Sequence, residues 1–126
     1  MSRAPQLLIQ ADDLTGAADT AVAFAEAGLR TVVVPWREGG ELGARLDAVA
    51  GRHEPECLAV DTAGRDLDAG DAARRATEVG RWAAREQVGA VYKKVDSVLR
   101  GHPGAELSAL REGLGPAAGF QFEPAP

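Results

Sequence analysis

The chain has 126 residues, of which 45% are hydrophobic and 26% are charged, and its formal net charge is −5. These values are typical of one globular domain with a buried core. The acidic balance argues against a nucleic-acid partner, which usually requires a basic face, and the apolar runs are too short to cross a membrane. The single cysteine, Cys57, excludes an intrachain disulfide, and we expect a cytoplasmic protein.

The chain begins with a short apolar run followed by a helical pattern. Residues 7–9 predict a strand, and the alanine-rich stretch 15–27 predicts a helix because its apolar residues recur at helical spacing. Asp13 or Thr15 is expected to cap the start of this helix, and Gly28 to end it.

The middle of the chain repeats this alternation. The β-branched run 31–34 predicts a second strand, and the spacing of apolar residues predicts a helix over 41–50. A third strand is predicted over 57–60. The longest helical pattern covers 68–88, with Gly89 expected just after its end.

The last predicted strand covers 90–92, and Pro103 suits the first turn of a final helix. Four alternations of strand and helix predict an α/β fold: a three-layer open parallel sheet of about four strands with βα repeats, Rossmann-like or flavodoxin-like. We expect one domain over residues 1–115 and an irregular tail over 116–126.

Charged clusters follow three of the predicted strands. Asp12 and Asp13 follow the first, the segment Asp61 to Arg65 follows the third, and the segment Lys93 to Arg100 follows the fourth. The carboxyl ends of parallel strands share one edge of the sheet, and open α/β sheets bind ligands there. We therefore expect the three clusters to surround one pocket.

The first cluster also has a plain structural explanation, which is an acidic cap at the start of a helix. Asp12 and Asp13 repel each other, and a helix cap needs only one carboxylate, so a functional role is favoured over capping alone. Thr15 offers a hydroxyl at the helix start, and Gly16 allows close approach to the backbone.

The second cluster leaves two interpretations open. Asp61 and Arg65 either clasp a polyhydroxy acid, with the guanidinium taking its carboxylate, or simply pair with each other. Asp66 and Asp68 are assigned to capping the next helix.

The third cluster is the most polar. Lys94 suits an acid group or a phosphate, Asp96 suits a hydroxyl, and Ser97 and Arg100 lie nearby. Lys94 and Asp96 share a side if the strand continues through them. The alternative is a surface turn with solvated ion pairs.

Some site types are not indicated. The sequence contains neither GxGxxG after a strand nor GxxxxGK[ST], so it shows no familiar phosphate-binding loop. His53 and His102 have no partner at metal-ligand spacing, and no metal site is expected.

Three motifs in this order, ADDLTGAADT, DTAGR and YKKVDSVLRGHPGAEL, resemble the N-terminal sugar-binding domain of the four-carbon acid sugar kinase family. The resemblance covers roughly residues 7–110. It implies a two-domain, ATP-dependent kinase acting on threonate, erythronate or 3-oxo-tetronate, in which the first domain holds the sugar acid and a later domain binds the nucleotide.

The resemblance implies the site residues one by one. The matching positions are Asp12, Asp13, Thr15, Gly16, Asp61, Thr62, Arg65, Lys94, Asp96, Ser97, Arg100 and Gly101. The cations would face the substrate carboxylate, the aspartates would accept sugar hydroxyls, and Asp13 is the candidate base. Three positions depart from the family, which often has serine at Gly64, threonine at Val98 and asparagine at His102.

The resemblance also sets limits on activity. ATP and Mg²⁺ are expected only with the missing nucleotide domain, so we expect this chain alone not to phosphorylate its ligand. Two interpretations stay open: a truncated product, or one half of an enzyme whose nucleotide domain lies on a companion chain. A receiver-like signalling domain is the alternative, with Asp12, Asp13 and Asp61 as its acidic site. A poorly folding remnant is the third.

Overall fold

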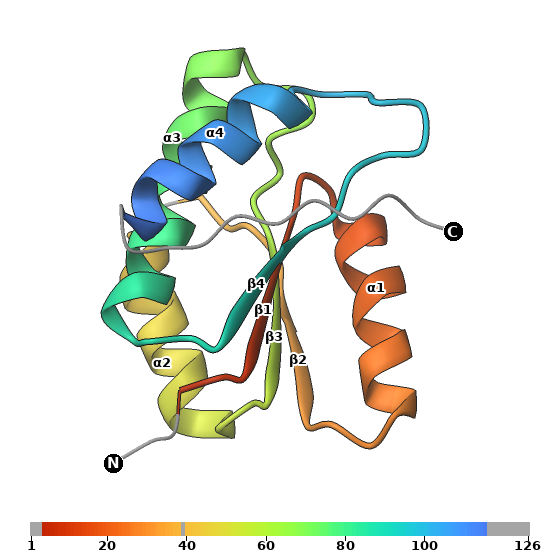
Figure 1. Ribbon diagram of the computed structural model, residues 1–126, viewed down its shortest axis with the longest axis vertical. Coiled ribbons are helices and arrows are strands. Elements are labelled where there is room, and N and C mark those ends of the chain that lie inside the picture. Colours follow the sequence, from red (N-terminus) through yellow and green to blue (C-terminus); the bar gives the residue numbers. More distant parts are fainter. Residues whose placement is uncertain (1–3, 39, 116–126) are drawn as a thin grey trace.

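The computed structural model describes residues 4–38 and 40–115 (Figure 1). Strands and helices alternate along them: β1 (Leu7–Ala11), α1 (Leu14–Glu26), β2 (Thr31–Val34), α2 (Leu42–His53), β3 (Cys57–Asp61), α3 (Ala69–Arg85), β4 (Ala90–Lys93) and α4 (Pro103–Leu114). The predicted α/β class is confirmed. The predicted tail over 116–126 lies outside the described residues.

All strand pairs in the sheet are parallel, in the order β2-β3-β1-β4. β1 lies between β3 and β4. Ala11 of β1 is opposite Asp61 of β3, and Gln10 of β1 is opposite Lys93 of β4. The ends of β1, β3 and β4 therefore meet at one edge. The polar segments that follow these three strands begin side by side.

Helices cover both faces of the sheet (Figure 1). α1 packs on one face, and α2, α3 and α4 lie on the other, with α4 against α3. Leu8, Leu58 and Trp82 belong to the larger core under α2, α3 and α4. Ile9 and Ala17 belong to the smaller core under α1. β1 and β3 are buried on both faces, which explains their apolar sequences.

The two ends of α1 follow the sequence signals, whereas the end of α3 does not. Asp13 caps α1 by accepting a hydrogen bond from the Gly16 N–H at 2.9 Å, and Gly28 follows the helix with a φ of 98°. The prediction that Gly89 follows α3 is wrong, because α3 ends at Arg85 and Gln87 takes the left-handed conformation. Gly89 instead lies against the residue before β1, where a Cβ atom would be 2.8 Å from the Gln6 carbonyl oxygen.

Within residues 4–38 and 40–115, no helix combines the length and the apolar character that crossing a membrane requires.

Candidate functional site

The loops after β1, β3 and β4 meet around one guanidinium group. Arg65 Nη2 lies 3.1 Å from Asp12 Oδ1 and 3.4 Å from Asp96 Oδ1, and Arg65 Nη1 lies 3.3 Å from Asp13 Oδ2. Arg100 Nη2 contacts Asp96 Oδ1 at 2.8 Å. These five residues form what we call the aspartate–arginine cluster, and they come from three segments far apart in the sequence.

Backbone contacts hold the same loops together. The Arg65 N–H donates to the Asp12 carbonyl oxygen at 3.2 Å, and the Thr62 N–H donates to that of Ala11 at 2.9 Å. Gly101 has a φ of 82°, and a Cβ atom there would lie 2.5 Å from Asp12 Oδ2. Only a residue without a side chain fits this close approach and this backbone conformation without strain. The backbone of these loops therefore holds the residues of the cluster close together.

The cluster favours the charged form of its arginine. Burial alone would lower the pKa of Arg65, but its hydrogen bond to Asp12 and the charges of Asp12 and Asp13 raise that pKa above its ordinary value. Both Nη atoms are engaged by carboxylates. The buried Nε atom has no hydrogen-bond partner among residues 4–38 and 40–115.

Asp96 organises the turn after β4. Its Oδ2 atom accepts hydrogen bonds from the backbone N–H groups of Val98 and Arg100 and from Arg100 Nε, each at 3.1 Å. The side-chain hydrogen bond from Arg100 is the main reason why the pKa of Asp96 lies well below its usual value. β4 ends at Lys93, so the strand alternation expected for Lys94 and Asp96 does not extend to them.

Asp61 lies at the same edge but outside the aspartate–arginine cluster. Its side chain is buried and accepts a hydrogen bond from the Ala63 N–H at 2.7 Å. Burial raises its pKa, and the negative charges of Asp13 and Asp12 add to the rise. The alternative of an Asp61–Arg65 pair is not what the structure shows, because Arg65 pairs with Asp12, Asp13 and Asp96.

The remaining predicted residues lie around the cluster. Lys94 Nζ donates to the Val95 carbonyl oxygen at 2.9 Å, and the Lys94 side chain passes close to Gly16 at the start of α1. Thr15 is exposed at the first turn of α1, and Ser97 is exposed in the turn after β4. The segments that carry the cluster therefore also carry a lysine and two exposed hydroxyl groups.

A buried polar network below the cluster was not predicted. Lys93 Nζ pairs with Glu106 Oε2 at 3.2 Å, and Gln10 Nε2 donates to Thr62 Oγ1 at 2.8 Å and to Glu106 Oε1 at 3.4 Å. The sequence does contain a signal for it, because Glu106 occupies the same helix face as the buried Leu110. A charged residue at a core position requires a partner.

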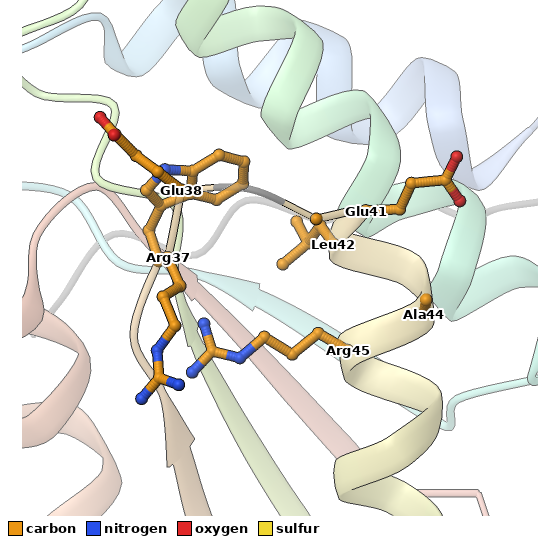
Figure 2. A pocket seen from close by; sticks show the side chains of 8 residues that line it. Arg37, Glu38, Glu41, Leu42, Ala44 and Arg45 are labelled. Atoms are coloured by element: carbon orange, nitrogen blue, oxygen red, sulfur yellow. The ribbon is translucent and has the colours of Figure 1, made fainter.

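A separate pocket of about 430 Å³ opens after β2, lined by Trp36, Arg37, Glu38, Gly40, Glu41, Leu42, Ala44 and Arg45 (Figure 2). Figure 2 shows the side chains of Arg37 and Arg45 extending to the same side of it. Arg75 stacks on the Trp36 ring at 3.6 Å and donates to the Thr62 carbonyl oxygen at 2.8 Å. The pocket lining contains none of the predicted site residues. Besides the Arg75–Thr62 hydrogen bond, a backbone hydrogen bond from Trp36 to Asp61 links the pocket to them.

Comparison with known proteins places these features in a family. The sequence profile described as "Sugar-binding N-terminal domain" matches residues 7–125. A D-threonate kinase of Bordetella bronchiseptica is 45% identical over 108 residues, which are 85% of this chain and 25% of the relative. A D-erythronate kinase of Heliobacterium modesticaldum is 32% identical over 110 residues, 87% of this chain and 24% of the relative.

A solved structure shares the fold. A crystal structure from Bordetella bronchiseptica, described as a domain of unknown function with bound citrate and as a domain-swapped dimer, aligns with a TM-score of 0.73 at 41% identity. The alignment covers 88% of this chain and 26% of that one. The chain thus spans about a quarter of the length of the relatives it matches.

Proposed function

Since the chain belongs to the Sugar-binding N-terminal domain family, we propose that it binds a four-carbon sugar acid, such as threonate or erythronate, at the aspartate–arginine cluster. The observation that carries the proposal is the meeting of Asp12, Arg65 and Asp96 from three separate loops within 3.4 Å. The citrate in the related structure supports a small polar carboxylate as the ligand type.

The contacts suggest a division of roles. Arg65 already gives both Nη atoms to carboxylates, so we assign the ligand carboxylate first to Lys94 and to Arg100, whose side chain is 63% exposed. Cationic side chains bind carboxylates through charge-assisted hydrogen bonds. Asp13 and Asp96 then accept hydrogen bonds from sugar hydroxyls, with Thr15, Gly16 and Ser97 at the rim.

In a complete kinase, one carboxylate would accept the proton of the hydroxyl that is phosphorylated. We assign this role to Asp13, because 30% of its side chain is exposed whereas Asp12 is buried. ATP and Mg²⁺ belong, in this proposal, to a nucleotide domain outside this chain, whether on a companion chain or in a longer protein. This chain would then hold and orient the sugar acid without phosphorylating it.

Isothermal titration calorimetry tests the binding proposal. We expect D-threonate or D-erythronate to bind with a Kd of roughly 1 μM to 1 mM, the usual range for enzyme substrates, and threitol, which lacks the carboxylate, to bind far more weakly. Lys94→Met and Arg100→Gln should each weaken binding, whereas Arg85→Gln, on the exposed part of α3, should not. No heat with any four-carbon sugar acid, from protein with dispersed amide NMR signals, would overturn the proposal.

The receiver-like alternative has less support. β1 pairs with β3 and β4 here, whereas in the flavodoxin-like order the first strand pairs with the second. Arg65 also lies between Asp12 and Asp13, where a receiver would hold Mg²⁺. We expect no phosphorylation of Asp61 by acetyl phosphate.

A further inference from the structure

A fully buried carboxylate lies beneath the aspartate–arginine cluster. Glu106 has 0% exposure, and its Oε2 atom pairs with Lys93 Nζ at 3.2 Å, where the lysine side chain is 6% exposed. Burying two charges is unfavourable unless they are paired and hydrogen-bonded. The pair is therefore unlike the exposed Arg85–Asp47 pair on the helices, which water can replace.

The Glu106 carboxylate connects the elements that carry the site. Lys93 is the last residue of β4, and Gln10, which donates to Glu106 Oε1 at 3.4 Å, belongs to β1. Gln10 also donates to Thr62 at the start of the loop after β3. One side chain of α4 thus contacts β1 and β4, and through Gln10 it is linked to the loop after β3.

The closest link runs to the loop that carries Arg65. A Cβ atom on Gly64 would lie only 2.8 Å from Glu106 Oε1 and 3.3 Å from the Ala72 Cβ atom, so the backbone of this loop lies directly against the carboxylate and against α3. Arg65 is the next residue, and its Nη2 atom reaches Asp12 and Asp96. A displacement of Gly64 would therefore carry the guanidinium out of reach of its partners.

We infer that Glu106 is a positioning residue for the site: its carboxylate sets where the Gly64–Arg65 backbone lies, and Lys93 supplies the charge that allows the carboxylate to remain buried. The effect on ligand affinity rests on the proposed function. The effect on Arg65 itself does not, and it can be measured without a ligand.

The test compares the Arg65 Nε–Hε NMR signal, identified by its loss in Arg65→Lys, between wild type and three variants. Glu106→Ala removes the carboxylate next to the Gly64 backbone. Gly64→Ala adds a Cβ atom that displaces this backbone from the carboxylate. The double variant Lys93→Met/Glu106→Gln removes both charges but keeps side chains of similar shape. Arg85→Gln is the control for loss of an exposed ion pair. Thermal unfolding and D-threonate affinity are measured on the same samples, with affinity taken well below each unfolding midpoint.

We expect Glu106→Ala and Gly64→Ala to displace the Arg65 signal and to weaken D-threonate binding about tenfold, the equivalent of one hydrogen bond to a charged group. In the double variant, the Arg65 signal should remain at its wild-type position. A lowered unfolding midpoint with an unchanged Arg65 signal in the folded variants would overturn the inference.

If Glu106→Ala does not fold, the inference is tested by the Arg65 Nε–Hε signals of Gly64→Ala and of the double variant. If wild type binds no sugar acid, the proposed function fails, and the NMR signal still judges the role of Glu106.

Discussion

Arg65 and Asp12 are joined by a 3.1 Å contact between Nη2 and Oδ1, although one follows β3 and the other follows β1. Their side chains are 19% and 6% exposed, so water replaces little of the interaction. The contact exists because β1 and β3 are parallel neighbours with Ala11 opposite Asp61, which brings the two loops out of the sheet together.

Replacing Arg65 should destabilise the protein strongly. Arg65→Ala leaves Asp12 buried and unpaired beside Asp13, and we expect the free energy of unfolding to fall by about 3–5 kcal/mol. Arg65→Lys should lower the free energy of unfolding by less than Arg65→Ala does. It should still lower it, because one ammonium group cannot pair with all the carboxylates that contact the two Nη atoms. Urea denaturation measures both.

The matched control for this prediction is Arg85→Ala. It breaks the Arg85–Asp47 pair, whose side chains are 58% and 53% exposed, and should cost about 0–1 kcal/mol. Equal effects of the two alanine variants would show that the aspartate–arginine cluster is not ordered in solution.

Two glycines near the start of α4 should respond in opposite directions to alanine. Gly101→Ala places a Cβ atom 2.5 Å from Asp12 Oδ2 at a φ of 82°, and we expect a loss of about 1–3 kcal/mol. Gly104 lies in the first turn of α4, where a Cβ atom would meet nothing within 4 Å. Gly104→Ala should therefore stabilise by about 0.4–1 kcal/mol, because it restricts the unfolded chain. Urea denaturation measures both changes, and destabilisation by both would contradict the local geometry.

Asp61→Asn should stabilise the protein at neutral pH. Burial raises the pKa of Asp61 in the folded state above the ordinary value of 3.8. As pH rises through the window above 3.8, the unfolded state loses its proton first, so wild-type stability falls and the loss persists at higher pH. Asparagine keeps an oxygen for the Ala63 N–H and carries no charge.

Chemical denaturation at several pH values checks this prediction. The advantage of Asp61→Asn should be present at pH 7 and disappear below about pH 3.8. An asparagine variant less stable than wild type at pH 7 would show that the ionised carboxylate is favoured in the fold.

Asp96→Asn should have the opposite pH dependence. Hydrogen bonds from Arg100 hold the pKa of Asp96 below its ordinary value of 3.8. The stability that this carboxylate contributes is therefore complete above that value and is lost as pH falls below it. In the same denaturation series, wild type should exceed the variant at pH 7, and the difference should narrow in acid. A difference independent of pH would mean that packing, not charge, is responsible.

The sequence predicts the framework well, for physical reasons that are local. The run 57–60 is apolar because it is buried, and the Asp13 cap follows from its place before a helical pattern. The end of α3 is harder to predict, because Gln87 adopts a left-handed conformation that usually selects glycine.

The partners of the site residues cannot be predicted in the same way. The sequence allows Arg65 to pair with Asp61, four residues away, but in the structure it pairs with Asp12 and Asp96. The choice of partner depends on the order of the strands in the sheet. This order cannot be predicted from the spacing of apolar residues along the sequence. The Lys93–Glu106 pair has the same cause, because it requires β4 and α4 to be placed before the two charges can be matched.

Gly64 stands where the resembling family often has serine, and its Cα atom faces the Glu106 carboxylate so closely that a serine Cβ would overlap Oε1. Sequences that carry serine at this position must accommodate it by a different acid geometry or by a shifted fourth helix. The identities at positions 64 and 106 are therefore expected to covary during evolution, with glycine at position 64 accompanying glutamate at position 106.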